Sequence, residues 1–217
     1  MSEDQALAAL RHSDLTASEL AALARTPSTL KRRKVVLALA THPRTPRHSS
    51  IPLLRRMFTF DLMQVALTPA VPADLKRLAE QQILIRLGAL SAGEKISLAR
   101  RASGRVAAEL LQDSDSRIVR AALDNSRLTE PLLEAALAND KAPQALFDIV
   151  SAHATWSERR DLQIALLRSE KTPLDKVGRF ANNFSADFLR EILPESTRSA
   201  LRDREPGGDH SLKHSED

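Results

Sequence analysis

The chain has 217 residues, of which 42% are hydrophobic and 28% charged, with a net charge of +4 at pH 7. It contains no cysteine, which excludes disulfides, thiolate-bound iron–sulfur clusters and cysteine-based zinc sites. Aromatic residues make up only 3% and there are six glycines, so alanine and leucine supply the apolar surface, a composition that favours helices over strands.

The N-terminal stretch MSEDQALAALRHSD carries acids where a secretory signal has a basic start and an apolar core. The longest apolar runs, such as VVLALA at 35–40, are far too short to span a membrane. We therefore expect a cytoplasmic protein without a membrane partner. The last sixteen residues hold three basic and five acidic side chains, so the excess positive charge lies in the rest of the chain and favours an anionic partner.

Helix-start signals recur along the chain. Four segments have the form of a capping box, in which a hydroxyl and an acid satisfy the first free N–H groups: TASE (16–19), SAGE (91–94), TWSE (155–158) and TPLD (172–175). Prolines also stand where the first turn of a helix tolerates them, at Pro46, Pro72, Pro131 and Pro173.

Apolar residues between these signals are spaced three or four apart, and no stretch alternates with the period of a strand. We expect helices over 4–11, 17–25, 29–41, 47–58, 61–68, 73–80, 81–88, 92–101, 104–112, 117–124, 130–138, 143–153, 157–168, 174–181 and 185–193. The second helices of successive hairpins start roughly 20 to 30 residues apart, the interval at which helical hairpins stack. The prediction is an all-α, right-handed α-solenoid forming a single domain over 1–195, followed by a flexible polar tail at 196–217.

One unit of this pattern is DSDSRIVRAALDNSRLTEPLLEAALAND (113–140), and its turn has counterparts in HPRTP (42–46), NSRLTEP (125–131) and SEKTP (169–173). These segments resemble HEAT-like repeats of the leucine-rich-repeat-variant kind found in bacteria. The resemblance implies an α-solenoid that offers a curved surface to a macromolecule. The founding type of these repeats binds an iron–sulfur cluster through cysteines, a role that a chain without cysteine does not share.

Candidate metal and phosphate sites are weak. His42 and His48 flank a proline-rich corner without a nearby acid, and His210 and His214 lie beside Asp209 in the polar tail. The segment DSDS (113–116) begins like a calcium loop, but the oxygen ligand and glycine required next are replaced by arginine and isoleucine. Gly-rich phosphate loops and nucleophile elbows are absent from the sequence. We predict no metal, no cofactor and no catalytic residue.

One class of enzymes is built on HEAT-like solenoids, the alkylpurine DNA glycosylases. Trp156, Arg159, Arg160 and Asp161 stand together in TWSERRD and supply an aromatic, two cations and a carboxylate. Such an enzyme also needs a second aromatic wall for the nucleotide, whereas Trp156 is the only tryptophan and there is no tyrosine. The glycosylase is therefore the least favoured function.

Paired basic residues recur in three successive second helices. The pairs are Arg55 and Arg56, Lys76 and Arg77, and Arg100 and Arg101, with Arg159 and Arg160 as a further extension. Stacked helices lie about 8–10 Å apart, so equivalent positions form a ladder of positive charge. We expect a non-enzymatic scaffold whose basic concave face binds an acidic protein surface; the alternative is a nucleic-acid-binding module that uses the same ladder.

Overall fold

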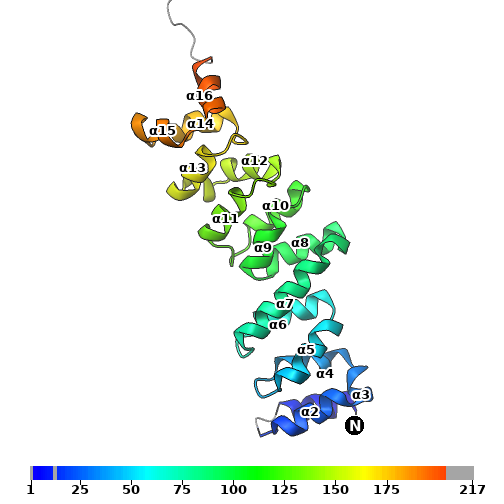
Figure 1. The fold of residues 1–217 in the computed structure, drawn as a ribbon. Helices are drawn as coiled ribbons and strands as arrows, with labels where there is room; N and C mark the ends of the chain where they lie inside the picture. Colours follow the sequence, from blue (N-terminus) through cyan, green and yellow to red (C-terminus); the bar gives the residue numbers. More distant parts are fainter. Residues whose placement is uncertain (1, 12–13, 204–217) are drawn as a thin grey trace, which may run out of the picture. The chain divides into compact units, whose positions relative to one another are not determined.

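The computed structural model describes residues 2–11 and 14–203, which fold into sixteen α-helices and two 3₁₀ helices (Figure 1). Within these residues there is no β-strand, so the all-α class is confirmed. The chain divides into two compact units: unit 1 comprises Met1–Leu111 and Arg120–Thr129, and unit 2 comprises Gln112–Val119 and Glu130–Asp217. A single domain over 1–195 stays a prediction.

Unit 1 packs its helices mainly against close neighbours in the sequence. Helix α4 contacts α1, α5 and α6, and α7 contacts α5, α6 and α9, so apolar side chains such as Leu39, Leu62 and Ile83 are fully buried. The elements are α1 (Glu3–Leu10), α2 (Ala17–Arg25), α3 (Pro27–Leu30), α4 (Arg33–Thr41), α5 (Arg47–Arg56), α6 (Thr59–Leu67), α7 (Ala73–Arg86), η1 (Leu87–Ala89), α8 (Ala92–Arg101) and α9 (Gly104–Leu110).

Unit 2 is built in the same way. Helix α13 contacts α11, α12 and α14, and α14 contacts α16, around a core that includes Phe147, Leu133 and Phe180. The elements are α11 (Glu130–Leu137), α12 (Gln144–Ala152), η2 (Trp156–Glu158), α13 (Arg160–Leu167), α14 (Leu174–Ala181), α15 (Ala186–Ile192) and α16 (Glu195–Arg202). Helix α10 (Ser116–Leu123) contributes residues to both units.

Three predictions about where helices begin and end are wrong. Helix α7 runs unbroken through the break expected at residue 80, because the sequence there consists of good helix formers without a cap or a proline. The helix expected over 29–41 is divided between α3 and α4. The predicted tail begins too early, since Pro194 stands at the start of α16 and Thr197 is buried; residues 204–217 of that tail lie outside the described residues.

Four corners between helices share one hydrogen-bond pattern. The first corner residue accepts the N–H of the third on its side chain: His42 from Arg44 (3.2 Å), Asn125 from Arg127 (2.8 Å), Asn139 from Lys141 (3.0 Å) and Ser169 from Lys171 (3.2 Å). The fourth residue donates its N–H to the carbonyl of the first and is buried: Thr45, Leu128, Ala142 and Thr172. Three of the four corners end in a proline that stands at the start of the next helix: Pro46, Pro143 and Pro173.

Two of these corners carry a further bond that explains their Thr-Pro sequence. Thr45 Oγ1 donates to the carbonyl of Leu39 at 2.7 Å, and Thr172 Oγ1 donates to the carbonyl of Leu166 at 2.6 Å. Each hydroxyl thus binds a carbonyl in the last turn of the preceding helix, where the regular i,i+4 partner is missing. The prediction that HPRTP and SEKTP are hairpin corners is confirmed.

Replacing either buried threonine by valine keeps the shape of the side chain. It removes the hydroxyl that makes the shortest hydrogen bond to the carbonyl of Leu39 or Leu166. We expect Thr45→Val and Thr172→Val each to lower the free energy of unfolding by about 1 kcal/mol. Thr26→Val is the control, because Thr26 Oγ1 makes a comparable bond to the carbonyl of Ala22 at an exposed site where water replaces the hydroxyl. Urea unfolding followed by circular dichroism measures the difference; equal losses in all three variants would contradict this role of the corners.

Of the four predicted capping boxes, two are formed as expected. Thr16 with Glu19 and Ser91 with Glu94 make the reciprocal bonds. In TWSE no side chain caps η2, and in TPLD Thr172 turns inward while Pro173 takes the cap position. In the two boxes that are formed, the hydrogen bonds lower the pKa of the glutamate carboxyl. For Glu19 the main cause is the backbone N–H of Thr16, and for Glu94 it is the hydroxyl of Ser91.

Because the pKa of each capping carboxyl is lower in the folded chain than in the unfolded chain, its carboxylate stabilises the folded chain at pH values above the ordinary pKa of 4.5. This contribution is lost as the pH falls through the lower, folded pKa. We expect the difference in free energy of unfolding between the native chain and Glu94→Gln to shrink from about pH 6 to about pH 3. Chemical unfolding across that range measures it; a difference that grows on acidification would contradict the assignment.

Candidate binding groove

A groove of about 540 Å³ lies in unit 1 between the end of α6 and the end of α8. Its basic residues are Arg100, Arg101 and Arg127, its uncharged polar residues are Gln64 and Thr68, and its apolar residues are Met63, Leu67 and Pro69. We call it the α6–α8 groove. Since none of its lining residues is acidic, its charge is that of three guanidinium groups.

One buried side chain positions the three arginines. Asn125 is 3% exposed, and its amide Nδ2 donates to the carbonyls of Ala99 (2.7 Å) and Ala102 (3.1 Å), on either side of Arg100 and Arg101. Its Oδ1 accepts the N–H of Arg127 at 2.8 Å. The last turn of α8 and the corner after α10 are therefore held together through a single amide.

These arginines are available to a ligand. Arg100, Arg101 and Arg127 are exposed, and within the described residues they make no side-chain hydrogen bond or ion pair. Several other arginines of the chain are neutralised by a carboxylate, as Arg47 is by Asp74. The ammonium of Lys76 adds a fourth cation at the groove's edge, because its Nζ lies 3.3 Å from the carbonyl of Pro69.

The predicted ladder is thus brought together only in part. Arg100 and Arg101 line the groove, Lys76 lies at its edge through its bond to Pro69, and Arg77 lies on α7 outside the lining. Arg55 and Arg56, which are exposed, end α5 away from this groove, and Arg56 lines two separate hollows.

The proposed extension of the ladder lies in unit 2 and is already engaged. Arg159 Nη1 lies 4.0 Å from Glu130 Oε2, and the guanidinium of Arg160 lies 4.8 Å from the centre of the Phe184 ring. Both side chains therefore have partners within their own unit, unlike the arginines of the groove.

Arg127 was not among the predicted binding residues, although the sequence carries a signal for it. The third residue is basic in the four corners that begin at His42, Asn125, Asn139 and Ser169: Arg44, Arg127, Lys141 and Lys171. The recurrence is visible as HPR, NSR, NDK and SEK once the corners are aligned. The dibasic pairs in the helices obscured it.

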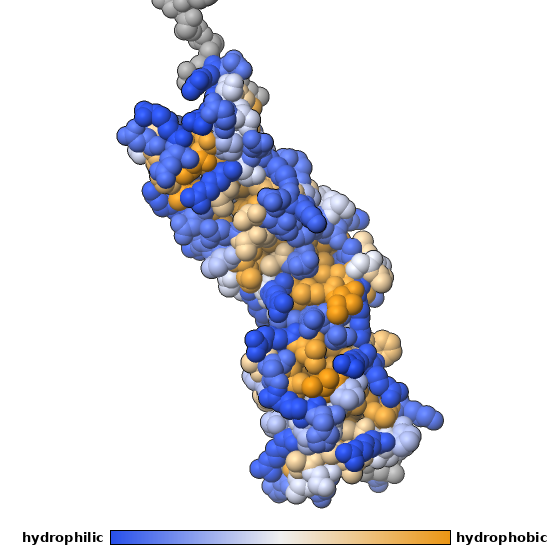
Figure 2. Space-filling view, in the orientation of Figure 1, coloured by the Kyte–Doolittle hydropathy of each residue, from blue (hydrophilic) through white to orange (hydrophobic). Residues whose placement is uncertain are grey.

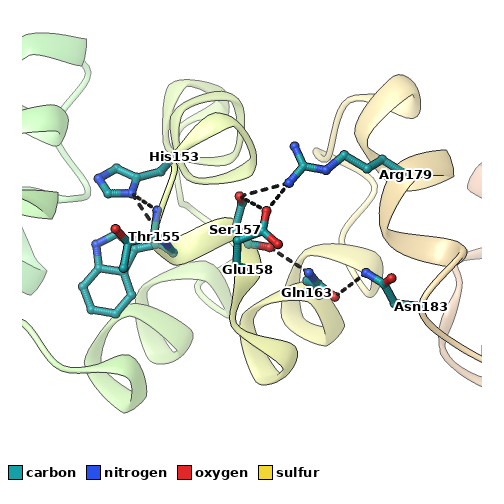
Figure 3. A network of polar contacts seen from close by, with 8 residues as sticks. His153, Thr155, Ser157, Glu158, Gln163, Arg179 and Asn183 are labelled. Atoms are coloured by element: carbon teal, nitrogen blue, oxygen red, sulfur yellow. Dashed lines mark hydrogen bonds and ion pairs between the residues drawn. The ribbon is translucent and has the colours of Figure 1, made fainter.

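Of the four residues considered for a glycosylase, Trp156 contributes its backbone N–H to a polar network around η2 (Figure 3). His153 Nδ1 accepts the N–H groups of Thr155 (3.2 Å) and Trp156 (3.3 Å), and the rings of His153 and Trp156 lie 6.5 Å apart. Trp156 is half-buried beside this histidine, and Asp161 is exposed in the first turn of α13.

The same network fastens η2 to α14. Gln163 Nε2 donates to the carbonyl of Ser157 at 2.8 Å and its Oε1 accepts from Asn183 at 3.1 Å, while Arg179 pairs with Glu158 (Figure 3). Ser157 is buried, and its hydroxyl bonds to Glu158 rather than to the imidazole of His153. The arrangement holds a corner and does not align a nucleophile with a base.

Candidate metal ligands are dispersed or engaged. The described residues contain no group of three or more histidines and carboxylates arranged to hold a metal ion. Asp115 caps α10 by accepting the N–H of Arg117 at 2.9 Å, and its hydrogen bond to the guanidinium raises the pKa of Arg117. The imidazole of His42 is used in its corner, and the exposed His48 lines a hollow with Arg25 and Arg56.

The second pair of candidate histidines cannot be placed. Asp209, His210 and His214 all lie outside the described residues.

Across 2–11 and 14–203, none of the helices combines the length and the apolar character that a bilayer crossing requires. Comparison with models of protein families, with curated proteins and with solved structures found no match.

The groove makes a prediction about stability. We expect Arg127→Ala to change the free energy of unfolding by less than about 0.5 kcal/mol, because the exposed side chain contacts no partner among the described residues and its N–H is retained. Asn125→Ala removes three hydrogen bonds and takes the amide donor away from the carbonyls of Ala99 and Ala102. We expect it to lower the free energy of unfolding by about 2–4 kcal/mol. Urea unfolding compares the two variants; a large loss in Arg127→Ala would mean that this arginine is structural.

Proposed function

We propose that the protein is a non-catalytic α-solenoid scaffold, right-handed and of the HEAT-like kind, that binds an acidic segment of another protein in the α6–α8 groove. The stacking is supported by the range of its contacts. Hydrogen bonds that join separate hairpins connect residues from 20 positions apart, as in Asn183 to Gln163, to 31 apart, as in Lys171 to Asp140. Contacts of this range are typical of repeats that touch only their neighbours.

The observation that carries the function is the unbalanced charge of the groove. Three exposed guanidinium groups and the nearby ammonium of Lys76 converge without an acidic lining residue. Arginine pairs with carboxylates through two parallel hydrogen bonds, so aspartate and glutamate side chains fit this surface. Gln64 and Thr68 add polar groups for the partner's backbone.

An acidic protein segment fits better than nucleic acid. A nucleic-acid-binding surface gains its affinity from about 6–10 phosphate contacts and buries about 1,000 Å² or more. The groove offers four cations, and none of its lining residues is an aromatic on which a base would stack. A short run of carboxylates matches this number of positive charges.

The test measures binding of a fluorescein-labelled peptide built only from Glu, Asp, Gly and Ser, by fluorescence anisotropy at low salt. We expect the native chain to bind it and the affinity to fall as salt rises. Arg100→Glu with Arg101→Glu, and separately Arg127→Glu, should weaken binding at least about ten-fold, because the introduced carboxylates repel those of the peptide.

Arg44→Glu is the matched control. Arg44 is exposed and occupies the same corner position as Arg127, but it does not line the groove. The control should bind like the native chain. Equal losses in Arg44→Glu and Arg127→Glu would show that net charge alone acts, and tighter binding of a mixed-sequence DNA duplex than of the peptide would favour the nucleic-acid alternative.

A further inference from the structure

Two adjoining hollows lie in unit 1 beside α3 and α5. The first, of about 170 Å³, has Leu30, Val36, Leu53 and Met57 among its lining residues and is bordered by Phe58, which is 64% exposed. The second, of about 140 Å³, has the apolar residues Ala24, Pro52 and, again, Leu30 and Leu53 among its lining residues, together with the buried Ser49. Because they share Leu30, Leu53 and Arg56, side chains that fill both must be neighbours on the ligand.

The size of each hollow suits one apolar side chain. A protein cavity of about 150 Å³ lined by aliphatic and aromatic residues holds a benzene molecule. Each hollow therefore accepts one leucine, isoleucine or phenylalanine side chain. Figure 2 shows apolar side chains reaching the surface between polar ones along unit 1, so apolar surface open to a partner is not confined to a single spot.

The rim of the hollows is positively charged. Lys31 and Arg56 border the first, and Arg25, His48 and Arg56 border the second; all four are exposed and make no side-chain bond among the described residues. The one acid of either lining is Asp61, which is buried.

The carboxylate of Asp61 is paired with an arginine of the same unit. Arg33 donates to both of its oxygens, at 2.7 and 2.9 Å, and these hydrogen bonds raise the pKa of the guanidinium. The same guanidinium lies 4.8 Å from the centre of the Phe58 ring and so fixes one wall of the first hollow. The remaining rim charge is therefore positive and open to a ligand.

We propose that these two hollows form a docking site for an acidic amphipathic helix, which inserts two apolar side chains spaced three or four residues apart. Residues at that spacing lie on one face of a helix with Cβ atoms about 5–6 Å apart, as adjoining hollows require. Carboxylates beside the anchors face Lys31, Arg56 and Arg25. The inference rests on the proposed function for the acidic protein partner and adds the anchor residues that select it.

The test uses two capped helical peptides of Glu, Ala and Lys with a net negative charge. The first carries two leucines four residues apart, and the second has serine at both positions. We expect the leucine peptide to bind the native chain more tightly than the serine peptide, by about ten-fold for each leucine, because binding removes the apolar surface of each leucine side chain from water. Methyl NMR should show the resonances of Leu30, Leu53 and Met57 shifting only with the leucine peptide.

Protein variants separate the anchor from the charge. Leu30→Asn, at a partly exposed residue shared by both hollows, should abolish the preference for leucine. Lys31→Glu with Arg56→Glu, at exposed positions, should weaken both peptides and keep the preference. Equal affinity of the two peptides for the native chain, or methyl shifts confined to residues outside the hollows, would overturn the proposal.

The two proposals fail differently. In one outcome, the double variant Arg100→Glu with Arg101→Glu still binds the peptide of Glu, Asp, Gly and Ser, and the preference for the leucine peptide is also seen. The groove assignment is then wrong and the docking site stands. If that double variant releases the peptide and leucine confers no advantage, the docking site is wrong and the groove assignment stands.

Discussion

The corner between two helices is the constraint on which this structure depends. Each corner turns the chain within four residues and needs partners for N–H and C=O groups that no helix satisfies. In the four corners that begin at His42, Asn125, Asn139 and Ser169, the side chain of the first residue and the N–H of the fourth provide them, and the fourth residue is buried. A helix of eight or nine residues is marginal by itself in water, so its stability comes from the packing that the corner imposes.

Asn125 shows how the same corner serves a site. Its Oδ1 does what the other first residues do, but its Nδ2 reaches the carbonyls of Ala99 and Ala102 in the preceding hairpin. A bond needed for folding thereby also fixes the distance between the arginines of α8 and Arg127. The groove can then be preorganised without any of its charged side chains being tied to a structural partner.

The sequence predicted the helical class and most of the helices because proline, capping residues and apolar spacing act locally. It predicted the corners HPRTP and SEKTP for the same reason. It failed at α7, where a break was expected although no cap or proline marks one, and at α16, which follows Pro194 in a polar stretch. The binding residues predicted from the sequence stay a prediction; of these residues, Arg100 and Arg101 line the α6–α8 groove and Lys76 lies at its edge. Arg127 was missed because the dibasic pairs in the helices obscured the basic residues at the corners, and because its place beside Arg100 and Arg101 depends on hydrogen bonds of Asn125 across 23 to 26 residues.

The third corner residue gives its backbone N–H to the turn, and any amino acid except proline can supply that N–H. Its side chain is therefore free for another use: Arg44, Arg127 and Lys141 are exposed, whereas Lys171 donates its ammonium to the carbonyls of Asp140 and Ala142 in the preceding corner. Chemistry at this position can change from one hairpin to the next while the hairpin itself is preserved. Exchange of single residues at these bends would therefore alter the surface of the molecule and leave its interior untouched.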